Sequence, residues 1–462
     1  MMQSMNREKP GGHGRNAGRR LSVEHSTTER RALAGLLMAV VVVLAVGLPV
    51  AAADAPNSLN GLEATYDVVA ALKWKKGRLN VNSTALVTNN SDTAVNALTF
   101  NVAPAKIGRL ILGDVTAGGE AASARIEDQN VIVTLPYPLE PNQQVSVTIV
   151  YAAWFGTTGA NKQFLFAKVS GVASAYRWIP WLSKAYPFIT PTYGEPFVTK
   201  ASDEVRVSIT PDRPLSIATS GHKTGVVGLT QTFVAHNVRD FNFSASPSYV
   251  EHTDMWGDVA ITYYTIQLPL AKLQTWTVAA LDRFSERVGP YPYSDYAVAE
   301  VPTGPSMESP GMIWITQKAI ARGTIKYLIV HETAHQWFYG ILGNDQASEP
   351  FADEAMAEFL TRDLIGHRAS HCAEADLDKH VYDYSSGCYY EVIYVQGDIY
   401  VDTYRQRVGN SAFWDGMRRY YNDNKFKLGG TRELWDTLDA RAGGAGGDHG
   451  DRFPSIYPGA GG

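Results

Sequence analysis

Apolar and polar residues alternate in short stretches from about residue 57 to residue 250. Val131, Val133 and Leu135 are typical of these stretches, which are separated by clusters of Asn, Gly, Asp and Pro. A period of two places the apolar side chains on one face of a strand, and the polar clusters supply turns. Residues 54–250 are therefore predicted to form a β-rich domain.

The spacing of apolar residues becomes helical after about residue 269. A chain of 462 residues with 45% hydrophobic content can form two or three domains with cores of their own. We therefore expect an α+β multidomain fold in which residues 251–441 form a second, mainly α domain. The helices predicted there span residues 269–288, 324–342, 353–365, 397–408, 411–422 and 431–440.

The two ends of the chain differ from both domains. The Arg-rich polar segment 1–31 precedes the uncharged apolar run Ala32–Ala53, which is the order found in export segments. Residues 1–53 are thus either a cleaved signal or an anchor that stays in the membrane, and both alternatives predict an exported protein of the cell envelope or the exterior. Residues 442–462 are Gly-rich and lack apolar periodicity, so we expect a disordered tail.

The net charge bears on whether the protein binds nucleic acid, and the cysteines bear on whether a disulfide forms. The formal net charge is −5, so the basic surface typical of a nucleic-acid-binding protein is not expected. The chain has two cysteines, Cys372 and Cys388, and an exported protein can join them in a disulfide. Two free thiols are the alternative.

The sequence HETAH at residues 331–335 has the pattern H-E-x-x-H in a helical context. On a helix, His331 and His335 lie one turn apart on the same face, so both imidazoles can reach one metal ion, while Glu332 lies beside them. A catalytic zinc site usually has three protein ligands. Glu354, after 18 further residues, begins the next helical segment and is the predicted third ligand. Glu358, one turn later, is either a group that orients a ligand histidine or a solvated helix charge.

The stretch from His331 to Glu354 resembles the M1 family of gluzincin metallopeptidases, which includes aminopeptidase N and the leukotriene hydrolases. Its pattern H-E-x-x-H-x18-E fits without a gap. Three further stretches are similar to the family: PSMES at residues 305–309 to G-A-M-E-N, YVQG at residues 394–397 to Y-x-K-G, and VGPYPY at residues 288–293 to the usual entry to the catalytic domain. The resemblance implies a saddle- or sandwich-like β domain followed by a thermolysin-like catalytic domain.

The resemblance also assigns roles to residues of this chain. Glu308 would bind the free α-amine of a peptide, and Tyr394 would stabilise the oxyanion, although Tyr389, Tyr390 and Tyr400 are alternative phenols. Several positions depart from the family pattern. Pro305 and Ser309 replace Gly and Asn, Asp353 and Ala355 stand where Asn and Gly are common, and Gln396 stands where Lys is usual. The large C-terminal helical domain of many family members has no counterpart in the predicted elements.

The resulting prediction is a zinc-dependent aminopeptidase with one Zn²⁺ per chain and peptides as substrates. His331, His335 and Glu354 hold the metal, and Glu332 activates a metal-bound water. An endopeptidase or another hydrolase on the same site is one alternative. An inactive binding protein is another, although the intact base Glu332 argues against it. The oligomeric state stays open.

Overall fold

The computed structural model describes residues 61–159, 163–184, 198–385 and 387–458. They belong to one compact unit that spans residues 53–462. The export signal or anchor predicted over residues 1–53 lies outside the described residues. Within the described ranges, none of the helices combines the length and the apolar character needed to cross a membrane.

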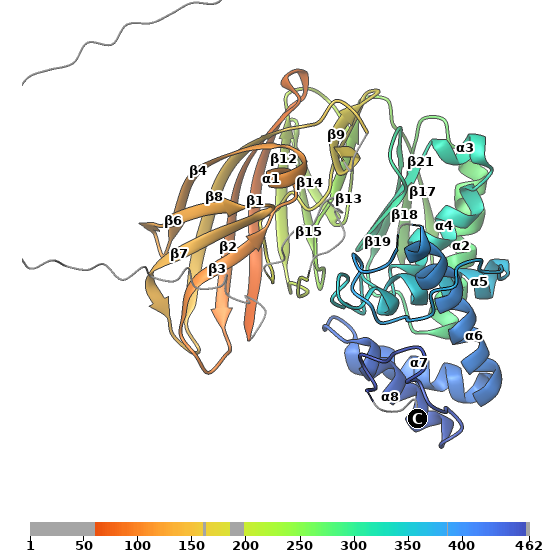
Figure 1. The fold of residues 1–462 in the computed structure, drawn as a ribbon. Coiled ribbons are helices and arrows are strands. Elements are labelled where there is room, and N and C mark those ends of the chain that lie inside the picture. The colour runs from red at the N-terminus through yellow and green to blue at the C-terminus, as the bar shows by residue number, and fades with distance from the viewer. Residues whose placement is uncertain (1–60, 160–162, 185–197, 386, 459–462) are drawn as a thin grey trace, which may run out of the picture. The chain divides into compact units, whose positions relative to one another are not determined.

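An eight-stranded sheet forms the largest part of the β-rich region (Figure 1). β1 and β12 are parallel, whereas the other neighbouring pairs are antiparallel. Along β1, Val68 and Ala70 are buried while Val69 is exposed, which is the alternation that predicts strands. The strands in spatial order are β14 (His222–Val227), β15 (Thr230–Ala235), β12 (Val205–Pro211), β1 (Leu62–Lys73), β2 (Arg78–Asn89), β8 (Gln144–Trp154), β4 (Arg109–Ala117) and β5 (Glu120–Ala121).

Two four-stranded sheets complete the β-rich region. The first contains β13 (Ser216–Thr219), β16 (Phe243–Ser246), β10 (Val172–Ala175) and β9 (Phe166–Val169). The second contains β11 (Trp181–Leu182), β3 (Val95–Asn101), β7 (Asn130–Leu139) and β6 (Ser123–Glu127). Short helical turns connect strands at α1 (Pro104–Ile107), η1 (Trp74–Lys76) and η2 (Gln163–Leu165). All three sheets contribute to one hydrophobic core.

A five-stranded sheet links this core to the helices. Its order is β17 (Val250–Trp256), β18 (Val259–Thr265), β19 (Asp295–Val301), β21 (Met312–Thr316) and β20 (Met307–Ser309). In β21, Met312 and Trp314 pack into the core of the β-rich region, whereas Ile313 and Ile315 pack into the helical core. The central strands β19 and β21 are therefore buried on both faces, which explains why neither shows the apolar–polar alternation of a half-exposed strand. The prediction of a mainly α region did not include these strands.

Helices cover one face of the five-stranded sheet, where α2 and α4 lie side by side (Figure 1). The observed helix α6 has the bounds predicted from the sequence, and α2, α5, α7 and α8 differ from their predicted bounds by one or two residues. The helices are α2 (Leu270–Arg287), α3 (Lys318–Arg322), α4 (Ile325–Ala334), α5 (Glu354–Ile365), α6 (Gly397–Val408), α7 (Asn410–Asn424) and α8 (Thr431–Ala442), with η3 (Pro350–Ala352) and the π-helix η4 (Tyr390–Gln396).

The prediction of a disordered tail from residue 442 was wrong for the residues that the structure describes. His449 and Phe453 are buried, and the ring of Phe453 lies 4.8 Å from that of Phe351. The backbone N–H of Leu377 donates to the carbonyl of Arg452 at 2.7 Å. This order could not be predicted from the Gly-rich composition, because two buried aromatic side chains hold the segment and they form no periodic pattern.

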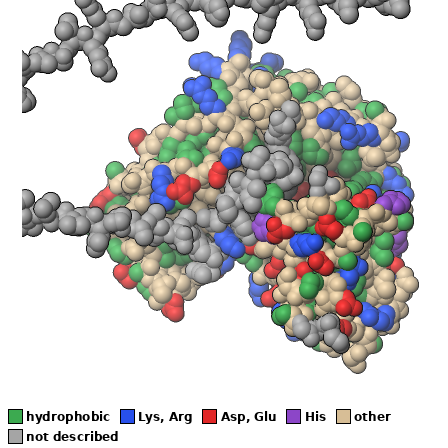
Figure 2. Space-filling view, viewed as in Figure 1, with side chains coloured by type: hydrophobic (Ala, Val, Ile, Leu, Met, Phe, Trp, Pro, Cys, Tyr) green, Lys and Arg blue, Asp and Glu red, His purple; other side chains and the backbone are tan. Residues whose placement is uncertain are grey.

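Positively and negatively charged side chains are mixed on the surface of the protein. Lys and Arg side chains are interspersed with Asp and Glu on the face shown in Figure 2. Neither sign of charge covers this face alone, in keeping with the small formal net charge of the chain.

Candidate active site

The helix that carries HETAH is shorter than predicted. The predicted helix 324–342 ends at Ala334, and His335 takes the C-cap position. Beyond it, the N–H of Gly340 donates to the carbonyl of His335, five residues back, and Tyr339 has a φ of 116°. A bulky residue at this φ ends a regular helix. The prediction was wrong here because contacts outside the helix, rather than local propensity, determine the backbone.

Three ligand atoms nevertheless converge as the sequence predicts. The Nε2 atoms of His331 and His335 are 3.3 Å apart, and Glu354 Oε2 lies 3.4 Å from the first and 3.2 Å from the second. A tetrahedral zinc ion with ligands at about 2.0–2.1 Å requires about 3.3–3.4 Å between any two of them. The three measured edges match this value, so the residues fit a zinc ion without rearrangement.

Each histidine has a carboxylate behind it. Nδ1 of His335 lies 2.9 Å from Asp353 Oδ1, and Nδ1 of His331 lies 3.1 Å from Glu358 Oε2. A carboxylate at Nδ1 holds the proton on that nitrogen and leaves Nε2 free to bind metal. Asp353, which departs from the family pattern, is thus a candidate for orienting His335 that the sequence reasoning missed. The only signal was its position next to the third ligand.

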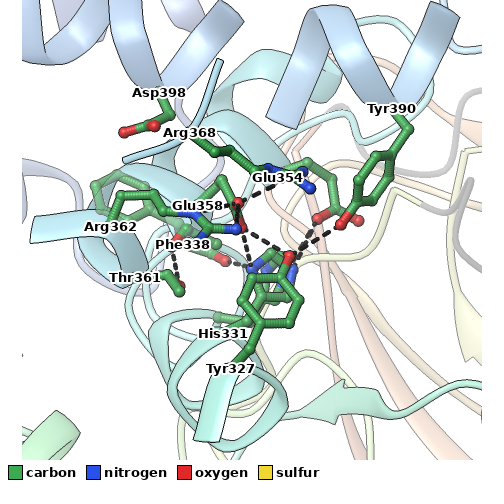
Figure 3. A network of polar contacts seen from close by, with 12 residues as sticks. Tyr327, His331, Phe338, Glu354, Glu358, Thr361, Arg362, Arg368, Tyr390 and Asp398 are labelled. Carbon is green, nitrogen blue, oxygen red and sulfur yellow. Dashed lines mark hydrogen bonds and ion pairs between the residues drawn. The ribbon is translucent and has the colours of Figure 1, made fainter. Parts of the chain in front are cut away.

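The carboxylate of Glu358 is the centre of a polar network drawn in Figure 3. It accepts hydrogen bonds from the Tyr327 hydroxyl at 2.9 Å and from Arg362 Nε at 2.7 Å, and it is fully buried. The sequence left two interpretations of Glu358 open. Its burial and its distance to His331 exclude the solvated helix charge and favour the orienting role.

Glu332 lines a cavity of about 230 Å³ together with the three ligands. Its side chain is only 5% exposed. Burial raises the pKa of Glu332 to about 7, while His331 and His335 oppose this shift. The structure therefore places a buried carboxylate beside the ligand set, where a general base for the attacking water has to lie.

Glu308 lies in the same cavity, on the edge strand β20. It is 4% exposed, and its Oε1 atom has no hydrogen-bond partner among the described residues. Burial raises the pKa of Glu308 to about 8, against the opposing effect of His335. A buried carboxylate oxygen without a partner is unfavourable, so the position is suited to a cationic ligand group.

Tyr394 reaches the cavity from the π-helix η4. Its ring stacks on that of His331 with centroids 5.5 Å apart. Burial and the neighbouring Glu354 raise the pKa of Tyr394 well above its usual value, so the phenol keeps its proton and can donate it in a hydrogen bond. Of the alternative phenols, Tyr390 also lines the cavity, whereas Tyr400 bonds His449 of the C-terminal segment at 2.7 Å.

The segment before η4 is cross-linked. Cys372 and Cys388 form a disulfide, which confirms that alternative of the sequence analysis. Gln396, at the position where the family motif has Lys, donates to the carbonyls of Cys372 and Glu374, both at 2.9 Å. Its Oε1 atom accepts a hydrogen bond from Arg452 at 2.9 Å. Gln396 thus fastens the disulfide segment and the C-terminal segment to the helix that carries Tyr394.

Three converging ligand atoms, a neighbouring carboxylate and a phenol make this a candidate zinc hydrolase site. At the level of sequence, no family profile and no curated protein matches the chain. Among solved structures, a mutant of a two-domain M1 zinc metallopeptidase bound to L-arginine matches with a TM-score of 0.64 at 17% identity. The match covers 84% of this chain and 94% of that one.

Two further solved structures agree. The M1 zinc metallopeptidase from Deinococcus radiodurans has a TM-score of 0.63 at 16% identity, over 84% of this chain and 94% of its own. A mutant from the same organism bound to a Tyr-Ser-Ala substrate has a TM-score of 0.61 at 16% identity, over 83% and 93%. The chain therefore has the fold of the two-domain M1 zinc metallopeptidases, and the predicted fold class is confirmed.

Proposed function

We propose that this protein is a zinc-dependent peptidase that removes N-terminal residues from peptides. The observation that carries the proposal is the triangle of ligand atoms from His331, His335 and Glu354, whose edges of 3.2–3.4 Å match a tetrahedral zinc site. A bound zinc ion supplies Lewis-acid polarisation of the scissile carbonyl and lowers the pKa of water.

Three residues near the metal ligands carry out proton transfer, stabilisation of the transition state and binding of the substrate's amino terminus. Glu332 accepts a proton from the attacking water and returns it to the leaving amine. Tyr394 donates a hydrogen bond to the carbonyl oxygen as negative charge develops there, a contact that strengthens in the transition state. Glu308 forms an ion pair with the substrate's α-ammonium, which sets the distance from the N-terminus to the cleaved bond.

The unpartnered Oε1 atom of Glu308 supports the aminopeptidase over an endopeptidase, because it leaves one buried carboxylate oxygen available for the ammonium group. An inactive binding protein is disfavoured, since it has no need for Glu332 or for an ordered Tyr394. One of the structurally similar enzymes was solved with a Tyr-Ser-Ala substrate, so short peptides are the first substrates to test.

The test compares tripeptides with a free α-amine and the same tripeptides after N-acetylation. The wild-type protein loaded with zinc should cleave the free peptides at least about 100-fold faster in terms of kcat/KM, and Glu308→Gln should reduce this preference. Glu286→Gln, at an exposed position of α2, is the matched control. Equal cleavage of free and acetylated peptides would instead identify an endopeptidase.

We also propose that the protein acts outside the cytoplasm. The apolar run 32–53 behind an Arg-rich segment supports export, and a disulfide between Cys372 and Cys388 is compatible with an oxidising compartment. Fractionation of cells that express the full chain tests this proposal. Activity found only in the cytoplasmic fraction would refute it.

A further inference from the structure

Glu308 is followed in β20 by Ser309, whose hydroxyl is held entirely by residues of the β-rich region. Asn242 Nδ2 donates to Ser309 Oγ at 2.8 Å, and the Ser220 hydroxyl lies 2.9 Å from it. Ser309 Oγ in turn donates to Asp240 Oδ1 at 3.2 Å. A hydroxyl has one proton to donate and two lone pairs, so these three contacts saturate it.

Asn242 is the centre of this group. Its side chain is fully buried, and its Oδ1 atom accepts a hydrogen bond from the backbone N–H of Arg177 at 2.6 Å. Its amide nitrogen uses both protons, on Ser309 Oγ and on Asp240 Oδ1 at 3.2 Å. Each polar atom of the side chain thus has a defined partner, which leaves Asn242 a single orientation.

The same group also contacts the segment after the zinc motif. The Tyr339 hydroxyl donates to Asp240 Oδ2, and Arg177 Nη2 donates to that hydroxyl at 2.8 Å. Tyr339 is the residue with a φ of 116°, and the carbonyl of its neighbour Phe338 lies 3.0 Å from Nδ1 of His335. Contacts to Asp240 therefore offset an unfavourable backbone conformation four residues after a metal ligand.

The side chain of Gln336 binds the backbone at the end of β20 and just after it. Gln336 Nε2 donates to the carbonyl of Ser309 at 2.8 Å, and its Oε1 atom accepts from the N–H of Gly311 at 2.8 Å. Gln336 directly follows His335 and is fully buried. The strand that carries Glu308 is thus fastened by its side chains to the β-rich region and by its backbone to the zinc motif.

We propose that Asn242 and Ser309 are positioning residues that hold the Glu308 carboxylate in the cavity. The β-rich region thereby determines how strongly Glu308 binds the substrate's α-amine. This inference rests on the proposed aminopeptidase function. Ser309 stands where the family motif has Asn. In this chain the short hydroxyl completes a network that reaches β20 from Asn242, Asp240 and Ser220.

The experiment measures KM and kcat of the zinc-loaded full chain for a free tripeptide and its N-acetylated form. Ser309→Ala and Asn242→Ala should raise KM for the free peptide about tenfold, because the unrestrained carboxylate loses one well-placed charged contact. Cleavage of the acetylated peptide and zinc content should not change. Ser309→Thr keeps the hydroxyl and should restore part of the preference.

Ser244→Ala is the matched control. Ser244 is a fully buried serine of β16 whose hydroxyl contacts the Tyr249 hydroxyl at 2.8 Å and the carbonyl of Ala173 at 3.4 Å, and neither partner belongs to β20. Variants at Ser309 and Asn242 that lose stability but keep the wild-type preference for free amines would overturn the inference, and so would loss of zinc. If the wild-type protein itself cleaves both peptides equally, the aminopeptidase proposal fails first and this inference with it.

Discussion

The carboxylate of Asp353 should contribute measurably to zinc affinity. Its Oδ1 atom lies 2.9 Å from Nδ1 of His335, and its Oδ2 atom accepts a hydrogen bond from Gln346 at 2.7 Å. Asp353→Ala removes the group that fixes the tautomer and the ring orientation of His335. Loss of such a partner weakens metal binding by about 10- to 100-fold, which corresponds to about 1.4–2.7 kcal/mol.

A graded pair of variants separates geometry from charge. Asp353→Asn keeps an oxygen that can accept the Nδ1 proton but removes the negative charge, so its zinc affinity should lie between those of wild type and Asp353→Ala. Competition with a chromophoric chelator at fixed pH measures all three dissociation constants. Equal zinc affinity of wild type and Asp353→Ala would refute the orienting role.

The chain offers a matched control for this experiment. Asp398 is a buried carboxylate 2.8 Å from Nδ1 of His367, a pair that does not belong to the metal ligands. Burial raises the pKa of Asp398 to about 7, with His367 opposing the shift, so the neutral Asn is a mild replacement. Asp398→Asn should leave zinc affinity unchanged. A loss as large as that of Asp353→Ala would mean that both variants act through general destabilisation.

Three further predictions concern the surroundings of the site. Tyr394→Phe should lower kcat about 100-fold with zinc retained, whereas Tyr390→Phe should have a small effect; equal losses in steady-state kinetics would contradict this assignment. Replacing Cys372 and Cys388 by serine should cost about 3 kcal/mol in urea unfolding and reduce activity without releasing zinc, and unchanged activity would count against the role of the cross-link. Phe453→Ala should cost about 3–5 kcal/mol, and a loss below 1 kcal/mol would show that the C-terminal segment is not part of the core.

The sequence predicted features that depend on local spacing. The bounds of α6 follow from its apolar period, and the shared face of His331 and His335 follows from one helical turn, whereas Glu354 was placed beside them by the resemblance to the family pattern. Half-exposed strands such as β1 were also predicted, because apolar and polar residues alternate along them. In each case a single element exposes one face and buries the other, so its pattern is readable without the rest of the fold.

Features that depend on distant partners were missed. The central strands β19 and β21 are buried on both faces and have no alternation to read. The helix of the zinc motif ends early because Tyr339 is held by Asp240, 99 residues away in sequence. The C-terminal segment is ordered by Phe453, which packs on a partner from η3. None of these contacts can be predicted from the pattern of neighbouring residues.

The proposed zinc peptidase mechanism is tested most directly by measuring both the zinc content and the peptidase activity of Glu332→Gln. This variant keeps every metal ligand but removes the group that accepts the proton from water. It should bind zinc as the wild type does and lose at least about 100-fold in kcat/KM on free tripeptides, while Glu286→Gln keeps both properties. A Glu332→Gln protein that retains its zinc and its full activity would contradict the proposed mechanism.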